Sequence, residues 1–191
     1  MHKIEDVLDF WFTPDSLPQP DGSGGEGRDV WFNADPAFDR EIIDRFSGVY
    51  DAAASGRLAD WTRTAQGTVA LVIVLDQFPR NMFRESPRAF ETDPMALDVA
   101  EAAIARGLDR DIPKLMRLFL YMPFQHAEDI AVQQRSMRLH EGLDDEWLLG
   151  FARWHHDVIK RFGRFPHRNA VLGRQTTLEE REFLESGDSL F

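Results

Sequence analysis

The longest apolar run of the chain, residues 69–75, limits the folds that this sequence can adopt. Its valines favour a β-strand by intrinsic propensity, but the sequence has no second run like it, and one strand has no partner to pair with. The apolar pattern also continues from Thr62 to Phe78, which is longer than a typical strand. We therefore predict a central, buried helix that is apolar on all sides.

Apolar residues recur at helical spacing through most of the remaining chain, often with a recognisable start or stop signal. Pro123 is expected to open or kink a helix, because a proline disrupts a helix interior. The other predicted helices lie at residues 3–12, from Asp35 to Val49, at 96–108 with Gly107 as the stop, at 112–121 and at 147–162, and the last begins at the capping box of Thr177 and Glu180. The sequence thus predicts an all-α protein.

One stretch, residues 14–28, is rich in Pro, Gly and Ser and predicts a flexible loop. It lies too close to the N-terminus to be a domain boundary. At 191 residues, with 15 Phe and 5 Trp to fill a core, the chain fits one domain. We therefore predict a single helical domain over residues 1–191.

Charge and composition narrow the classes of partner. The formal net charge is −11, which repels nucleic acid and anionic membranes, so neither is an expected partner. There is no Cys, which excludes disulfides and thiolate metal sites. The N-terminal segment is too acidic for a signal peptide, and the longest apolar run is far below the roughly 20 residues that span a bilayer. We expect a soluble, cytoplasmic protein.

Polar residues in apolar surroundings indicate candidate site residues, and the first group follows the central helix. Asp76 falls among inward-facing positions, so its carboxylate needs a cation or several hydrogen-bond donors. Arg80, just past the expected helix break at Pro79, is the nearest candidate cation, with Arg84 behind it. Asn81 adds a neutral donor. A structural ion pair that fixes the turn is the alternative interpretation.

A second break resembles the first, because residues 162–169 again end a helix with Phe-Pro followed by Arg and Asn. Four polar residues lie at this turn, beyond the helix: Arg164, His167, Arg168 and Asn169. A guanidinium can bind a carboxylate or phosphate through two parallel hydrogen bonds. These residues are therefore candidate ligand-binding groups, together with those of the first turn.

Two histidines supply the candidate acid–base groups. His155 lies within the apolar arc of its helix and should face the core, whereas His126 lies at the edge of its arc. Asp129 shares a face with His126, although an acid there also suits a helix N-terminus. Two ligands do not make a metal site, and no metal, phosphate-loop or dinucleotide motif occurs, so we predict no metal and no cofactor.

The motifs LDQFPRNMFR, YMPFQHAED and FGRFPHRNAVLGR, with the opening VLDFWF and the Trp31–Phe32 pair, carry a resemblance that runs from Val7 to Leu184. The sequence resembles the bacterial domain-of-unknown-function family numbered 924. This resemblance implies a tetratricopeptide-like all-helical fold, in which antiparallel helix pairs stack into an α/α superhelix. It implies no activity.

Three functions remain open. The first is a binding or scaffold module, in which the arginines of both turns share a basic pocket for an anionic small molecule or peptide. The second is an enzyme that uses His126 or His155 as general acid or base, with a pKa set by Asp76 or Asp129, in a hydrolytic or transfer reaction on a small acidic substrate. The third is a purely structural polar network. The sequence indicates no oligomeric state or pathway.

Overall fold

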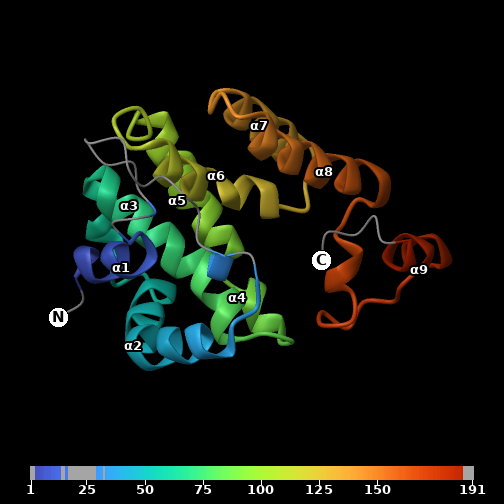
Figure 1. The fold of residues 1–191 in the computed structure, drawn as a ribbon, viewed down its shortest axis with the longest axis horizontal. Coiled ribbons are helices and arrows are strands. Elements are labelled where there is room, and N and C mark those ends of the chain that lie inside the picture. The colour runs from blue at the N-terminus through green and yellow to red at the C-terminus, as the bar shows by residue number, and fades with distance from the viewer. Residues whose placement is uncertain (1–2, 14–15, 17–28, 32, 187–191) are drawn as a thin grey trace. The chain divides into compact units, whose positions relative to one another are not determined.

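The computed structural model describes residues 3–13, 16, 29–31 and 33–186, and the chain divides into two compact units (Figure 1). Unit 1 comprises residues 1–84 and 88–123, and unit 2 comprises residues 85–87 and 124–191. In the described ranges the regular structure is helical and no strand occurs, which confirms the all-α prediction. The single domain stays a prediction. Apart from Ser16, the predicted loop at 14–28 lies outside the described residues.

Unit 1 contains the first helices of the chain and most of α6. Its longer elements are α1 (Ile4–Trp11), α2 (Pro36–Ala54), α3 (Ala65–Val72), α4 (Phe78–Met82), α5 (Asp93–Ala105) and α6 (Lys114–His126). The short elements are η2 (Asp29–Trp31), η3 (Ala59–Arg63), the π turn η4 (Ile73–Gln77) and, except for its first residue, η5 (Pro87–Phe90).

The predicted central helix exists and is buried, but its end differs from the prediction. It begins after Thr64, whose hydroxyl accepts a hydrogen bond from the Gly67 N–H at 3.0 Å. It then passes through α3, η4 and α4 without a break at Pro79 and ends at Met82, so the expected break at this proline is wrong. The π turn directly before Pro79 inserts extra backbone, which accommodates a ring that would clash with the preceding turn.

Aromatic rings fill the core of unit 1 around this helix. Phe78 is fully buried and lies 4.9 Å from the ring of Phe46, measured between centroids. Trp11 packs edge-on against Phe119 at 5.5 Å, and Trp31 lies 4.9 Å from the same ring. Helix α1 therefore lies over α3 with its apolar face inward, as the spacing of the first helix predicts.

Pro123 lies inside α6, which runs from Lys114 to His126. The expected separation into one helix that ends at Tyr121 and another that opens at Pro123 is therefore wrong. The boundary between the two units falls directly after this proline. No helix in the described ranges has both the length and the apolar character that crossing a membrane requires.

Unit 2 is built on a helix pair that Figure 1 shows side by side, α7 (Ile130–Glu141) and α8 (Glu146–Phe162). The connection of residues 142–145 makes the pair antiparallel, and Gly163, in the left-handed conformation with φ 70°, ends α8. The turn η6 (Pro166–Arg168) and α9 (Leu178–Glu185) follow. The predicted capping box at the start of α9 is confirmed. Tetratricopeptide-like stacking remains a prediction.

Polar residues occupy the buried face of α7, in contrast to the apolar core of unit 1. Gln133, Ser136 and His140 are all buried. The Gln133 amide donates to the carbonyl oxygens of Gln125 and Ala127, at 2.7 and 2.8 Å. These bonds satisfy carbonyl groups at the end of α6 that have no partner within their own helix. The face therefore joins α7 to the segment that precedes it.

Candidate functional site

The first predicted site lies in unit 1, around the π turn of the central helix. Asp76 is fully buried, as predicted, and accepts a hydrogen bond from the side-chain amide of Gln77 at 2.5 Å. Arg80 lies one turn later, with its Nη1 atom 3.4 Å from Asp76 Oδ1. The predicted cation is thus beside the buried carboxylate.

Arg80 has a second carboxylate partner, which sequence reasoning missed. It donates to both oxygens of Asp93, the first residue of α5, at 2.8 and 2.9 Å. Its guanidinium also donates to the Asp76 carbonyl oxygen. Desolvation opposes the charged guanidinium, but Asp76 and Asp93 outweigh it and raise the pKa of Arg80 above its ordinary value. The charge of Arg80 is therefore compensated within the chain.

The remaining residues of this turn converge on Asp39, in the first turn of α2. Asn81 donates its amide to Asp39 Oδ1 at 2.8 Å, and Arg84 donates to both carboxylate oxygens at 2.5 and 2.9 Å. These bonds join the end of the central helix to α2. No periodicity in the sequence indicates this contact, because the partners are 42 and 45 residues apart.

The second predicted turn lies in unit 2, where Glu180 is its main acceptor. The Glu180 carboxylate accepts from Arg164 at 2.6 and 2.9 Å, from the Asn169 amide at 3.2 Å and from the Thr177 N–H at 2.8 Å. The hydrogen bonds from Arg164 lower the pKa of Glu180 to about 2 despite its desolvation. The sequence identified Glu180 as a helix cap, but not as the partner of Arg164 and Asn169.

A half-buried pair, Glu128 with Arg174, was also missed. Arg174 donates to the two carboxylate oxygens at 2.6 and 3.0 Å, and the Phe165 N–H donates to Glu128 at 2.7 Å. Desolvation raises the pKa of Glu128, but these donors and the charge of Arg168 outweigh it, so the net shift is downward. The position of this acid near a helix N-terminus was the only available sequence signal.

His155 is buried, as predicted, with 6% of its surface exposed. Its Nδ1 atom lies 2.8 Å from the Phe151 carbonyl oxygen, so in the neutral ring Nδ1 carries the proton and Nε2 a lone pair. Desolvation lowers its pKa to about 3, and the positive potentials of His126, Arg168 and His140 act in the same direction. His155 is therefore uncharged at neutral pH.

The other histidines of unit 2 lie around His155. The ring of the half-buried His126 is 6.3 Å from that of His155, between centroids. His140, which is fully buried, has its Nδ1 atom 2.9 Å from the Ser136 carbonyl oxygen. Its pKa is lowered, first by desolvation and then by His126. The sequence analysis named His126 and His155 as candidate acid–base groups. It made no prediction for His140.

Arg168 acts electrostatically on His155 and packs on an aromatic ring. Only 6% of Arg168 is exposed, and its guanidinium carbon lies 4.5 Å from the centroid of the Phe165 ring. That ring also contacts His155, edge-on at 5.7 Å, and His167 at 5.6 Å. Phe165 is thus the platform around which the basic residues of η6 and α8 gather.

Asp129 acts as a helix cap. Its carboxylate accepts from the N–H groups of Ala131 and Val132, at 2.8 and 3.0 Å, and so begins α7. This is the alternative that its position near a helix N-terminus indicated. In the part of the chain that the structure describes, no three His, Asp or Glu side chains gather in a way that could hold a metal ion.

The structure therefore brings the predicted residues together in two groups, one in each unit. Asp76, Arg80, Asn81 and Arg84 form the group in unit 1, whereas His126, His155, Arg164, His167, Arg168 and Asn169 lie in unit 2. The predicted convergence of the two turns on one cavity stays a prediction, because the turns belong to different units.

The fold and these groups define an all-helical protein in which helix ends are joined by guanidinium–carboxylate pairs. Within that class, the chain belongs to the family described as bacterial protein of unknown function (DUF924), whose model matches residues 7–188. It is similar to the solved structure of the protein of unknown function ATU0120 from Agrobacterium tumefaciens, with 44% identity and a TM-score of 0.85 over 96% of this chain and 97% of that chain. No curated protein matches.

Proposed function

We propose that the protein is a binding module and that unit 2 binds the carboxylate or phosphate group of a small molecule or peptide beside Arg168. The observation that carries this proposal is the buried guanidinium of Arg168, which lies over the Phe165 ring and acts electrostatically on the buried His155. A fixed positive charge in such surroundings attracts an anion more strongly than it would in water. The predicted cytoplasmic location and the stacked helix pairs remain part of this proposal.

The electrostatics around His155 support the proposal. The positive charge of Arg168 contributes to the lowered pKa of His155, and burial removes the solvent that would screen this charge. A bound anion would reverse this potential, so it would raise the pKa of the nearby imidazoles.

Four other arginines of the two turns and their surroundings are engaged by carboxylates within the chain. Arg80 and Arg84 each donate two hydrogen bonds to an aspartate, and Arg164 and Arg174 each donate two to a glutamate. A ligand would have to displace those carboxylates. These four arginines fit a structural role, as the hypothesis of a polar network expects.

Calorimetric titration with inorganic phosphate and with succinate tests the proposal. Arg168→Ala should weaken binding by about tenfold or more, the value of a lost charge-assisted hydrogen bond, and should remove any rise of the melting temperature with added anion. Arg153→Ala is the matched control, because Arg153 is an exposed arginine on α8 of the same unit. Equal affinities for both variants and the unchanged protein would refute the proposal.

An enzyme is the second candidate, and the proximity of His126 and His155 favours it. Two imidazoles whose ring centroids lie 6.3 Å apart can contact the same substrate. The pKa of about 3 makes His155 a weak base. Hydrolysis of p-nitrophenyl phosphate and p-nitrophenyl acetate would be followed for the unchanged protein and for His126→Asn. Activity that disappears with His126→Asn supports an enzyme, whereas anion binding without any turnover leaves the binding module.

A further inference from the structure

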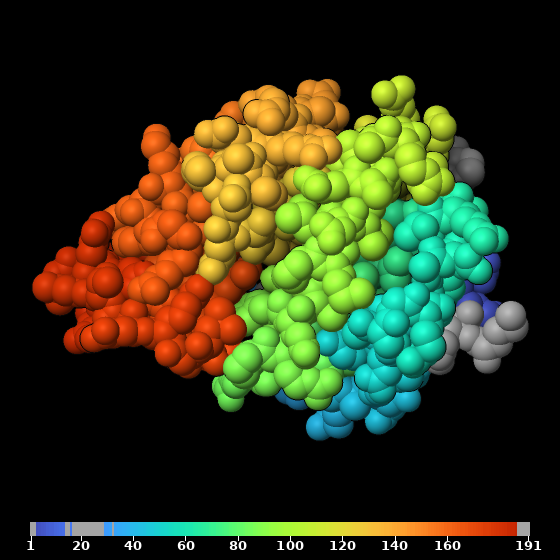
Figure 2. Space-filling view, turned by 180° about the vertical axis from the view of Figure 1, so that it is seen from behind, coloured from blue at the N-terminus to red at the C-terminus, as the bar shows by residue number. Residues whose placement is uncertain are grey.

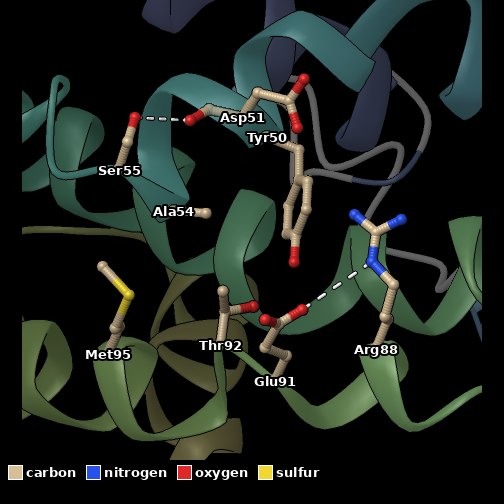
Figure 3. Close-up of a pocket in the computed structure, with 8 residues that line it drawn as sticks. All are labelled: Tyr50, Asp51, Ala54, Ser55, Arg88, Glu91, Thr92 and Met95. Atoms are coloured by element: carbon tan, nitrogen blue, oxygen red, sulfur yellow. Dashed lines mark hydrogen bonds and ion pairs between the residues drawn. The ribbon is translucent and has the colours of Figure 1, made fainter.

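A pocket in unit 1 contains none of the residues of the proposed anion site. It has a volume of about 440 Å³, which is within the range of small-molecule sites. It lies between the C-terminal half of α2 and the segment from η5 to α5. Figure 2 shows these parts of unit 1, coloured from cyan to teal and in green, side by side on the surface, and Figure 3 shows the lining side chains.

The hydroxyl groups that line the pocket donate their protons to acceptors within the protein. Thr92 donates to the Leu75 carbonyl oxygen at 2.5 Å, and Ser55 donates to the Asp51 carbonyl oxygen at 2.6 Å. Tyr50 is hydrogen-bonded to Thr92, and since the single proton of Thr92 goes to Leu75, Tyr50 is the donor of that bond. Oxygen lone pairs therefore remain for a ligand, and hydroxyl protons do not.

The phenol group of Tyr50 is held in a fixed position, because its side chain is buried and points into the pocket. Only 3% of its surface is exposed, and Figure 3 shows its ring extending from α2 toward Thr92 and Glu91. The ring is fixed edge-on against Phe83, with centroids 5.3 Å apart. The phenol oxygen is thus an acceptor held at the bottom of the pocket.

The charges of the pocket also favour a cation. Asp51 and Glu91 contribute two negative charges and Arg88 one positive charge, which leaves one negative charge in excess. The guanidinium carbon of Arg88 lies 3.9 Å from the centroid of the Phe83 ring. Its Nε atom lies 3.8 Å from Glu91 Oε2. Desolvation raises the pKa of Tyr50; the hydrogen bond with Thr92 and the charge of Arg88 oppose this shift, whereas Glu91 and Asp51 add to it.

We infer that this pocket binds a small organic cation that carries a primary ammonium group on a short alkyl chain. An ammonium group offers three N–H donors and no acceptor, which matches a site that presents oxygen acceptors and carboxylates. Ala54 and Met95 form the apolar part of the lining, where the alkyl chain would lie. This inference does not depend on the anion site of unit 2.

Nuclear magnetic resonance titration of the full chain tests this inference with three probes of the same length: n-butylammonium, butan-1-ol and butyrate. Butylammonium should shift the backbone amide signals of Ser55, Glu91 and Thr92 in a saturable way. The neutral alcohol and the anion should bind about tenfold more weakly or not at all, because they lack the charge or reverse it. Equal binding of the three probes, or no saturable shift at these amides with butylammonium, would overturn the inference.

Two variants separate binding from folding. Glu91→Gln changes an exposed side chain and should weaken butylammonium binding by about three- to fivefold, as for an exposed ion pair. Tyr50→Phe removes the buried acceptor and should weaken it by about tenfold. Asp60→Asn is the control, with the same change of charge at an aspartate that is 79% exposed and outside the pocket. Unchanged affinity in Glu91→Gln and Tyr50→Phe, with native melting curves, would contradict the proposed site.

Discussion

Thr92 donates its hydroxyl proton to the Leu75 carbonyl oxygen, 2.5 Å away, across 17 residues of sequence. Pro79 lies four residues after Leu75 and has no N–H group to donate to that carbonyl. Thr92, directly before α5, supplies this carbonyl with a hydrogen-bond donor from a neighbouring element. The central helix can contain a proline and continue to Met82 because a neighbouring element satisfies the exposed carbonyl.

Thr92→Val should destabilise the protein by about 1–3 kcal/mol, because the isosteric methyl group leaves the buried Leu75 carbonyl without its donor. Urea unfolding, followed by circular dichroism, measures this change. Thr92→Ser keeps the hydroxyl and should cost clearly less. If Val and Ser were equally stable at this position, the hydrogen bond would not be what stabilises the bent helix.

Gly67→Ala should destabilise the protein by about 1–3 kcal/mol through overpacking. A Cβ atom at Gly67 would overlap the Trp61 carbonyl oxygen and lie 2.9 Å from the Ile4 side chain, so α3 would have to move away from η3. Gly150→Ala, in α8, has no atom within 4 Å of the new Cβ and should instead stabilise by about 0.5–1 kcal/mol. Thermal unfolding of both variants gives the comparison, and a neutral Gly67→Ala would show that the two elements are loosely packed.

Glu180→Ala should cost roughly 2–4 kcal/mol, because it removes the common acceptor of Arg164, Asn169 and the Thr177 N–H in a largely buried position. A double-mutant cycle with Arg164→Ala, read by urea unfolding, isolates the part that belongs to the ion pair. Additive effects of the two substitutions would mean that Glu180 stabilises α9 as a cap alone.

Stability should fall between pH 6.5 and pH 5 because His155 is buried in its neutral form. Its native pKa of about 3 lies below the ordinary value near 6.5. Between these values the unfolded chain binds a proton that the native protein excludes. The stabilisation is therefore complete above pH 6.5 and decreases as the pH falls, by about 1–2 kcal/mol down to pH 5.

Urea unfolding at pH 7 and pH 5 measures this loss, in a range above the ordinary pKa values of the carboxylates. His155→Gln should make the loss smaller, whereas His156→Gln, which changes the adjacent residue that pairs with Asp157, should leave it unchanged. An identical loss in the unchanged protein and in His155→Gln would assign the pH dependence to other groups.

Sequence patterns predicted the helices well where the apolar spacing was long and the caps were local. Asp35 begins α2, the helix predicted over residues 147–162 is α8, and the capping box of Thr177 begins α9. The two errors concern prolines inside helices, at positions 79 and 123. A proline predicts a break only when nothing else satisfies the carbonyl group that it leaves without a donor.

The candidate site residues were found by the contrast between their polarity and their apolar surroundings, and this contrast predicted the burial of Asp76 and His155. It could not predict their partners. Asp39 lies 45 residues from Arg84, and Glu128 lies 46 residues from Arg174. A carboxylate on a helix surface looks the same in the sequence whether it faces water or a guanidinium from another element.

By itself, the sequence determined that this chain is helical, that its central helix is buried, and that polar residues gather at two Phe-Pro turns. These properties follow from spacing along one helix, which the chain geometry fixes locally. Only the tertiary structure decided that Arg80, Arg84, Arg164 and Arg174 each bind a carboxylate, that Arg168 lies over Phe165, and that the hydroxyl groups around Tyr50 retain only acceptors. The physical reason is that a hydrogen bond between distant elements depends on three-dimensional position, to which no local periodicity corresponds.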